Sequence, residues 1–479
     1  MPPIHERSAA SLARGIREGT LSPVAVVDAV LDRIDARNDR TNAFVTVTAD
    51  RARTAAREAE QAVERGDPLG PLHGVPVAVK DLDDVAGVTT TNGSLLFENH
   101  VASRTEPFVQ RLVDAGAIVV GKTNTPEFGL GCTTHNRVAG ATETPLAPGH
   151  VSGGSSGGAA AALADRLVPL APGSDTGGSI RTPAACCGVV GLKPTFGRVP
   201  MADERNAFST VTPFSHLGPL ARTVEDAALL LDVMAGPHPA DPFSLPEPET
   251  RYVDAVTDPV DDLTVAYSPA LDTYPVADSV RRVIDDAVDA FSDAGATVER
   301  ADPPLDPDSD EILDAYYTFA TVLWEGLFDG LETEGFDPRG EDRELLADST
   351  VETIIEADSV STRELAAAQR VRTRVLNAMT DLFADYDLLV CPTLCVPPFE
   401  VGDHPTEIEG TEIDPRRGWL LTQPFNLTGQ PVCALPAGQT DDGLPVGLQL
   451  VGPRLAERYV VAASAAYERV RPWAEQYPE

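Results

Sequence analysis

Lysine is almost absent from this sequence of 479 residues, in which only Lys80, Lys122 and Lys193 occur. Arginine supplies the other cations, and 37 basic residues face 74 acidic ones, so the formal net charge is −37. This balance argues against a nonspecific groove for nucleic-acid phosphates, although it does not by itself exclude tRNA as a partner. Carboxylate excess with so little lysine resembles proteins that stay hydrated in molar salt, where the Debye length is about 3 Å. We therefore predict a halophilic source, with simple acidic drift as the alternative.

Cysteine is also scarce, and long apolar runs are missing. Six cysteines occur, among them the adjacent Cys186 and Cys187 and a CxxxC pair at Cys391 and Cys395. None stands with histidines at zinc-site spacing, so we expect buried free thiols and no metal. No apolar stretch approaches the roughly 18 residues of a membrane-spanning helix. The N-terminus lacks a basic segment followed by an apolar run, so we expect no secretory signal and a cytoplasmic location.

Short apolar strands alternate with amphipathic helices along the chain, and hydrophobic residues make up 42% of it. Ser22-Pro23 is a typical helix start, and Gly66 a typical helix end. This alternation predicts an α/β fold with helices on both faces of a sheet. Helices are expected at 23–34, 49–65, 105–115, 223–235 and 276–294, within 309–333 and 361–385, and from 456 onward, and strands at 75–79, 118–120, 263–267, 296–299, 387–391, 431–435 and 446–451.

Two glycine-serine turns, at 153–158 and 173–179, flank an alanine-rich helix and a short strand expected at about 167–171. Such turns expose backbone N–H groups, which can cradle a phosphate, form an oxyanion hole or merely reverse the chain. A phosphate loop is disfavoured because neither a P-loop pattern nor a lysine is present. The segment 154–158 fits the GxSxG elbow of a serine hydrolase. The histidines that could complete that triad stand in polar or Pro-rich contexts and support it weakly: His216, His238 and His404.

Five segments resemble the amidase signature family: Gly74–Asp81, Gly121–Gly129, Ser152–Thr195, His216–Asp226 and Gly443–Gly452. The resemblance covers nearly the whole chain and thins between about 237 and 385. It implies an amidase-signature fold, an α/β/α sandwich around a mostly mixed β-sheet. It also implies one amidase domain over 1–479, with the signature core at about 70–235 and a less typical insertion at about 237–385.

The family cleaves amides with a serine–serine–lysine triad. Carried onto the matching positions, the resemblance implies that Ser179 is the nucleophile, Ser155 the bridging serine and Lys80 the base. A lysine is a base only when neutral, and burial at the end of an apolar strand lowers a lysine pKa. The alternative is a surface ion pair between Lys80 and Asp81.

The resemblance implies further features of the site. It predicts a cis peptide bond at Gly154–Ser155 and no cofactor. Lys122, Lys193, Arg181 and Asp175 are interpreted as structural, and Ser156 is expected to hydrogen-bond within the site. The oxyanion hole is expected to consist of the backbone N–H groups of Thr176, Gly177, Gly178 and Ser179.

Three functions compete. The first is a stand-alone amidase of class EC 3.5.1, with EC 3.5.1.4 expected, that hydrolyses a carboxylic acid amide to the acid and ammonia or an amine. The second is the glutaminase subunit of glutamyl-tRNA(Gln)/aspartyl-tRNA(Asn) amidotransferase, and the third is a catalytically silent scaffold. The segment Gly197–Ser209 lacks the Arg-Tyr-Gly that is usual in the glutaminase subunit, and Trp419–Pro431 resembles general amidases. These segments favour the stand-alone amidase.

The expected partner is a small-molecule amide, with no nucleic acid or membrane involved, and the family suggests a homodimer. Side chains within 130–137, 201–215 and 392–426 are expected to line the acyl pocket. Aromatic side chains there hint at an apolar acyl group. The individual pocket candidates are Cys132, Thr133, Phe208, Trp419 and Phe425.

Overall fold

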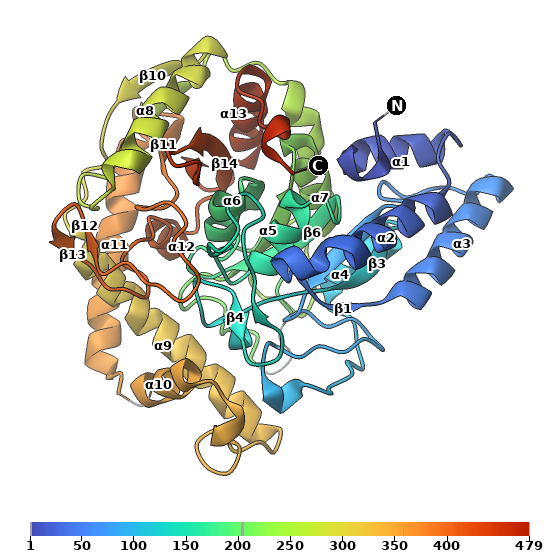
Figure 1. Cartoon of the computed structure of the whole chain (residues 1–479). Coiled ribbons are helices and arrows are strands. Elements are labelled where there is room, and N and C mark those ends of the chain that lie inside the picture. Colours follow the sequence, from blue (N-terminus) through green and yellow to red (C-terminus); the bar gives the residue numbers. More distant parts are fainter. Residues whose placement is uncertain (1, 203–205, 358, 479) are drawn as a thin grey trace.

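A single sheet of eleven strands runs through the computed structural model, which describes residues 2–202, 206–357 and 359–478. Figure 1 shows the chain wrapped around this sheet. From edge to edge the strands are β1 (Phe44–Val47), β3 (Ile118–Thr123), β2 (Pro76–Lys80), β6 (Leu170–Asp175), β8 (His216–Ala221), β7 (Val190–Lys193), β14 (Val432–Gln439), β15 (Pro445–Val451), β11 (Leu388–Pro392), β9 (Thr264–Tyr267) and β10 (Thr297–Arg300).

The sheet is mixed, as predicted. Strand β2 lies between β3 and β6 and is parallel to both, whereas β8, β7, β14 and β15 pair in antiparallel fashion. At the far edge β11, β9 and β10 are parallel again. Two small ribbons lie outside this sheet: β4 (His135–Asn136) with β5 (Gly140–Ala141), and β12 (Glu407–Ile408) with β13 (Thr411–Glu412).

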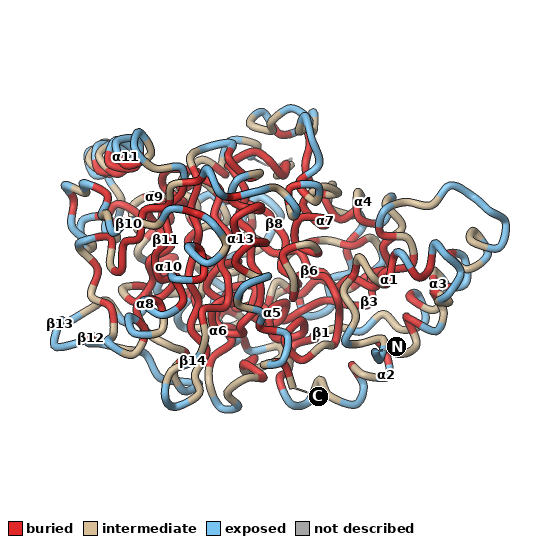
Figure 2. Tube along the Cα trace, turned by 90° about the horizontal axis from the view of Figure 1, so that it is seen from above, coloured by how far each residue is buried: buried red, intermediate tan, exposed pale blue. Residues whose placement is uncertain are grey.

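Helices cover both faces of the sheet. On one face lie α5 (Gly157–Ala164) and α6 (Arg181–Cys187), and on the other α7 (Val224–Met234), α8 (Asp278–Asp293) and α13 (Glu457–Val470). The remaining helices lie around this core: α1 (Ala9–Arg17), α2 (Pro23–Thr41), α3 (Ala49–Arg65), α4 (Pro107–Asp114), α9 (Ser309–Thr333), α10 (Asp348–Ala357), α11 (Thr362–Leu382) and α12 (Gln423–Thr428). In Figure 2 the buried segments follow the sheet and the exposed ones follow loops and outer helix turns.

Small residues allow the helices to approach the strands. A Cβ atom on Gly447 of β15 would lie 2.6 Å from the Cβ of Ala185 in α6. Val446, the neighbour of Gly447, pairs with Gly438 of β14, and successive residues point to opposite faces. A Cβ on Gly438 would lie 3.2 Å from Val283 of α8, which places α6 and α8 on opposite faces.

Most of the expected elements are present. Ser22 caps α2 through a hydrogen bond from the Ala25 N–H, and Gly66 ends α3 with a left-handed φ of 71°. The strand expected at about 167–171 is displaced, because β6 continues to Asp175 and absorbs the start of the second glycine turn. Helix α10 was not predicted, and the 309–333 segment forms one helix of 25 residues.

The stretch 237–385 contributes to both the sheet and the site. It supplies β9 and β10, and its helix α9 carries a row of apolar side chains that forms a cluster apart from the main core. The members of this row are Tyr316, Ala320, Trp324, Phe328 and Leu331, and they pack with Phe97, Leu346 and Ile354. Within the described ranges, every helix is too short or too polar to span a membrane.

All three lysines are fully buried, with 0% of each side chain exposed. The described surface therefore presents arginine as its only long-chain cation, against a large excess of carboxylates. Repulsion between those carboxylates opposes the compact state in dilute buffer and is screened by salt.

We expect the thermal unfolding midpoint to rise as KCl increases from 0.05 to 1 M. The Debye length shortens from more than 10 Å to about 3 Å over this range, which weakens repulsion within the folded chain. Circular dichroism at 222 nm measures the midpoint at each concentration. A flat or falling midpoint would contradict the prediction.

Candidate active site

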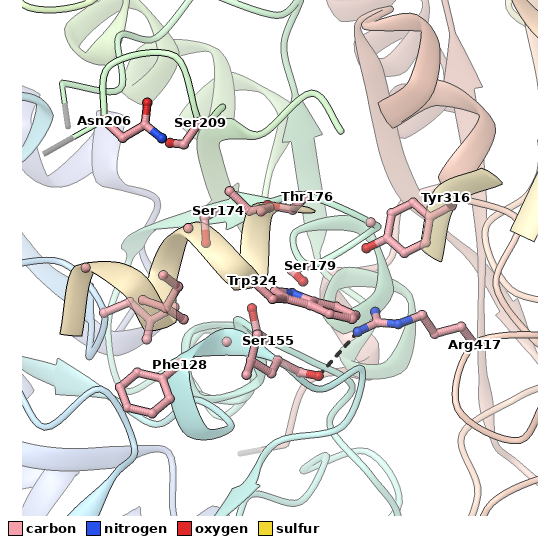
Figure 3. Close-up of a pocket in the computed structure, with 18 residues that line it drawn as sticks. Phe128, Ser155, Ser174, Thr176, Ser179, Asn206, Ser209, Tyr316, Trp324 and Arg417 are labelled. Carbon is pink, nitrogen blue, oxygen red and sulfur yellow. Dashed lines mark hydrogen bonds between the residues drawn. The ribbon is translucent and has the colours of Figure 1, made fainter. Parts of the chain in front are cut away.

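A cavity of about 230 Å³ opens at the carboxyl ends of β2 and β6. Because the two strands are parallel neighbours, with Val77 paired to Leu170, Lys80 and Ser174 reach the same edge of the sheet. The turn after β6, the segment before α5 and one face of α9 complete the wall. Figure 3 shows Ser155, Ser174 and Ser179 on one side of this cavity, with Tyr316, Trp324 and Arg417 around them.

Lys80 contacts three hydroxyl groups. Its Nζ lies 2.6 Å from the Oγ of Ser155, 3.0 Å from that of Ser156 and 3.0 Å from that of Ser174. Burial lowers the pKa of Lys80 to about 8, and the negative charges of Asp83 and Asp175 only partly oppose this shift. The amine is thus surrounded by groups that can donate or accept a proton.

The alternative pairing of Lys80 with Asp81 at the surface is wrong. Both residues are fully buried, and the Asp81 carboxylate lies 3.4 Å from the Nζ of Lys122 instead. Lys122 also donates to the Thr90 hydroxyl at 2.8 Å. Lys122 therefore serves as the structural counter-ion, as expected, and Lys80 is left to the serines.

The two serine-bearing turns are held together by their backbones. The Ser156 N–H donates to the Ser179 carbonyl at 3.2 Å, and Ser155 and Ser179 both line the cavity. The Gly154–Ser155 peptide bond is cis, as predicted. This arrangement places the Ser155 hydroxyl between the Lys80 amine and the side of the cavity on which Ser179 lies (Figure 3).

The expected oxyanion hole needs one correction. The Gly178 N–H donates to Asp175 Oδ1 at 2.9 Å, so that group is engaged within the turn and does not face the cavity. Gly178 has a φ of +126°, which suits glycine and directs its N–H back toward β6. Among the described residues, the N–H groups of Thr176, Gly177 and Ser179 have no acceptor. Three of the four predicted donors remain available.

Asp175 and Arg181 form a buried ion pair that fixes the turn. The Arg181 guanidinium donates to both Asp175 oxygens, at 3.0 and 2.9 Å, and also to Asn426 Oδ1 at 2.7 Å. Asp175 also accepts from the backbone N–H groups of Gly178 and Ile180. Burial alone would raise the pKa of Asp175, but Arg181 and the hydrogen bonds hold it well below its usual range. The structural role expected for this pair is confirmed.

The alternative serine–histidine triad does not form. His216 is buried in β8, where Nδ1 contacts the Asp175 carbonyl at 3.2 Å and Nε2 lies 3.2 Å from the Lys193 Nζ. Burial lowers the pKa values of both Lys193 and His216. Neither His238 nor His404 lines the serine cavity. Within the described residues no cluster of side chains suits a metal ion, and all six cysteines are free and buried.

None of the five individually predicted pocket residues lines the serine cavity. Cys132, Thr133 and Trp419 line a second cavity of about 550 Å³ next to it. Phe425 is fully buried in the main core, and Phe208 is 65% exposed away from the cavity. Of the wider ranges, 201–215 contributes Asn206 and Ser209, as the labels in Figure 3 show, while its residues 203–205 lie outside the described part of the chain.

The residues that were missed come mainly from α9. Tyr316, Trp324 and Leu327 form the wall opposite the serines, and Phe128 and Arg417 complete it. Aromatic and apolar residues spaced by three or four along 309–333 marked a buried helix face. That pattern could identify the face but could not show which part of it borders a cavity.

Known proteins share this sequence and this arrangement of the chain. Residues 25–461 match the model of the amidase family. The chain is 38% identical over 485 residues to an acylamidase of Rhodococcus erythropolis, covering 99% of this chain and 98% of that protein. It is 39% identical over 434 residues to a glutamyl-tRNA(Gln) amidotransferase subunit of Natronomonas pharaonis, covering 85% and 98%. The crystal structure of a bacterial aryl acylamidase from the amidase signature enzymes superposes with a TM-score of 0.95 at 34% identity, covering 99% and 98%.

Asp175→Asn is expected to lower the free energy of unfolding by about 3–5 kcal/mol, because it leaves the buried Arg181 guanidinium without a counter-ion. Urea unfolding followed by circular dichroism measures the change. Asp28→Asn is the matched control, since it makes the same substitution in the exposed pair with Arg53, where water replaces the lost partner. Equal losses in the two variants would contradict the structural role of the buried pair.

Proposed function

Because this chain belongs to the amidase family, we propose that it hydrolyses a carboxylic acid amide through an acyl-enzyme on Ser179, with Lys80 as base and Ser155 as relay. The products are the acid and ammonia or an amine, which corresponds to class EC 3.5.1 and specifically to EC 3.5.1.4. The observation that carries the triad is the 2.6 Å contact between the buried Lys80 amine and the Ser155 hydroxyl.

The reaction begins with proton transfer. Neutral Lys80 accepts the Ser155 hydroxyl proton while Ser155 accepts that of Ser179, whose oxygen then attacks the amide carbonyl carbon. The carbonyl π electrons move to oxygen, and the N–H groups of Thr176, Gly177 and Ser179 stabilise the negative charge. Each important donor of this kind contributes about 3–4 kcal/mol.

Collapse of the tetrahedral intermediate re-forms the carbonyl and breaks the C–N bond. Ser155 donates its proton to the departing nitrogen and regains one from Lys80, which leaves the acyl group esterified to Ser179. A water molecule then attacks the ester, and the same relay takes its proton. The acid leaves and the Ser179 hydroxyl is restored, so the cycle requires no cofactor.

A stand-alone amidase is favoured over an amidotransferase subunit. The acylamidase relative aligns over 99% of this chain, whereas the amidotransferase subunit of Natronomonas pharaonis aligns over 85%. The TM-score of 0.95 with an aryl acylamidase points the same way. Ammonia release from glutamine that depends on a co-purifying partner would instead support the amidotransferase.

We also propose a cytoplasmic enzyme of a halophile that acts as a homodimer. The support for the halophilic source is the net charge of −37 together with the burial of all three lysines. Equilibrium sedimentation in 2 M KCl would determine the oligomeric state.

Treatment with a fluorophosphonate tests the nucleophile without knowledge of the substrate. We expect one adduct on Ser179, located by intact-mass spectrometry and peptide mapping, and a labelling rate at least about 10²-fold lower in Lys80→Ala. Lys122→Ala is the control for removal of another buried lysine. Absence of an adduct in folded protein at high salt would exclude the proposed hydrolase, and an adduct on Ser155 would mean that the two serines have exchanged roles.

The rate of that labelling should rise with pH and level off above about 8, since only neutral Lys80 accepts a proton. Burial raises the pKa of Asp83 to about 6, so it is ionised at pH 8 and favours the charged form of Lys80. Asp83→Asn is therefore expected to move the pH profile to lower pH. Asp84→Asn, at the adjacent position, is the control, and identical profiles for the two variants would contradict the coupling.

A further inference from the structure

The guanidinium of Arg417 lies at the junction of two cavities. It lines both the serine cavity and the larger cavity beside it, and only 9% of the residue is exposed. Figure 3 shows the side chain extending toward the serine cavity, with a hydrogen bond to a backbone oxygen across it. A buried cation on the wall of a substrate cavity needs an explanation that is independent of the triad.

The contacts of Arg417 hold its orientation but do not neutralise its charge. Its Nη1 lies 2.9 Å from the Cys132 sulfur, and its Nη2 donates to the Leu130 carbonyl at 3.3 Å. The rings of Tyr316 and Trp324 each lie 5.6 Å from its central carbon. Burial raises the pKa of the Cys132 thiol, so this sulfur is not an anion.

No carboxylate in the described part of the chain forms an ion pair with the Arg417 guanidinium, although charges of both signs lie nearby. Asp414 accepts from the backbone N–H groups of Arg416 and Arg417 and from the Tyr317 hydroxyl. The neighbouring Arg416 guanidinium is paired with Glu356 at 2.8 Å. Arg181, the other buried arginine at the site, has its full carboxylate partner in Asp175.

We propose that Arg417 binds a carboxylate carried by the amide substrate, while the scissile carbonyl lies at Ser179. The planar guanidinium presents paired N–H donors that match the two oxygens of a carboxylate, and its aromatic neighbours keep it desolvated. The apolar face of α9 would contact the uncharged part of the substrate. This inference rests on the proposed amidase function and names the substrate class of the same site.

The carboxylate can belong to either half of the amide. On the acyl side, the substrate would be the monoamide of a dicarboxylic acid, and hydrolysis would yield a diacid. On the amine side, it would be an N-acylated amino acid or aminobenzoate, and hydrolysis would release the free amino acid. In both cases the charged group lies away from the bond that breaks, so it acts on binding and orientation.

Three matched anilides separate these cases. Butyranilide is neutral, succinanilic acid carries a carboxylate on the acyl side, and 4-butyramidobenzoate carries one on the amine side. Release of aniline or 4-aminobenzoate is followed by liquid chromatography at constant ionic strength in 2 M KCl, which screens repulsion by the acidic surface. We expect one carboxylate substrate to exceed butyranilide in kcat/KM by at least tenfold, and its identity assigns the side.

The measured quantity in each variant is the ratio of kcat/KM for that substrate to kcat/KM for butyranilide. Arg417→Met should reduce the ratio to 1 or below, chiefly through KM, and Arg417→Lys should restore part of it. A purely structural loss would lower the rates of both substrates and leave the ratio unchanged. Arg416→Met is the matched control, since it removes the adjacent ion-paired arginine and should retain the wild-type ratio.

The outcomes distinguish this inference from the proposed function. Hydrolysis of butyranilide without preference for either carboxylate, or a ratio unchanged in Arg417→Met, overturns the role of Arg417 and leaves the amidase intact. If none of the three anilides is cleaved, each is tested for slowing the fluorophosphonate labelling of Ser179. Stronger protection by a carboxylate anilide that Arg417→Met abolishes supports the inference, and equal protection by all three overturns it. Failure of the protein to label at all contradicts the proposed amidase itself.

Discussion

The active site is organised around an amine that the fold has removed from water. Strand β2 lies inside the sheet, so Lys80 at its end is fully buried, and the free energy of desolvating an ammonium favours the neutral form. The partners supplied to this amine are hydroxyls, which can donate to a neutral amine or accept from a charged one. A carboxylate in hydrogen-bond contact would instead hold the ammonium, as Asp81 does for Lys122. The same sheet thus contains two buried lysines whose roles are separated by the chemistry of their nearest neighbours.

The anion that the site requires is placed one layer away, under the turn that carries Ser179. Asp175 collects the Arg181 guanidinium and the N–H groups of Gly178 and Ile180, and so uses the inward-facing donors of the turn. The outward-facing N–H groups of Gly177 and Ser179 are left without acceptors in the described chain. Backbone polarity is in this way divided between the fold and the cavity.

The sequence was most informative where local chemistry has a local signature. The Ser22 cap, the Gly66 helix end and the strand before Lys80 follow from short-range rules, and the family resemblance located the three residues that meet in the cavity. The Gly178 error arose because four consecutive N–H groups look equivalent in sequence, while only the fold shows which one Asp175 takes. Phe208 and Phe425 were chosen for their aromatic character, but one is exposed and the other belongs to the core. The wall from α9 was missed because helical periodicity identifies a buried face without identifying what lies opposite it.

The confinement of every lysine to the interior has a practical consequence for the chemistry of the folded protein. Reagents that acylate or cross-link lysine amines find no such group on the described surface, since Lys80, Lys122 and Lys193 are all inaccessible. Modification at Lys122 or Lys193 therefore requires the sheet to open, and its rate becomes a direct reporter of large-scale opening. Enzymatic modification of lysine side chains is closed to the native state for the same reason, so the charge of its surface is adjusted only by the ions around it.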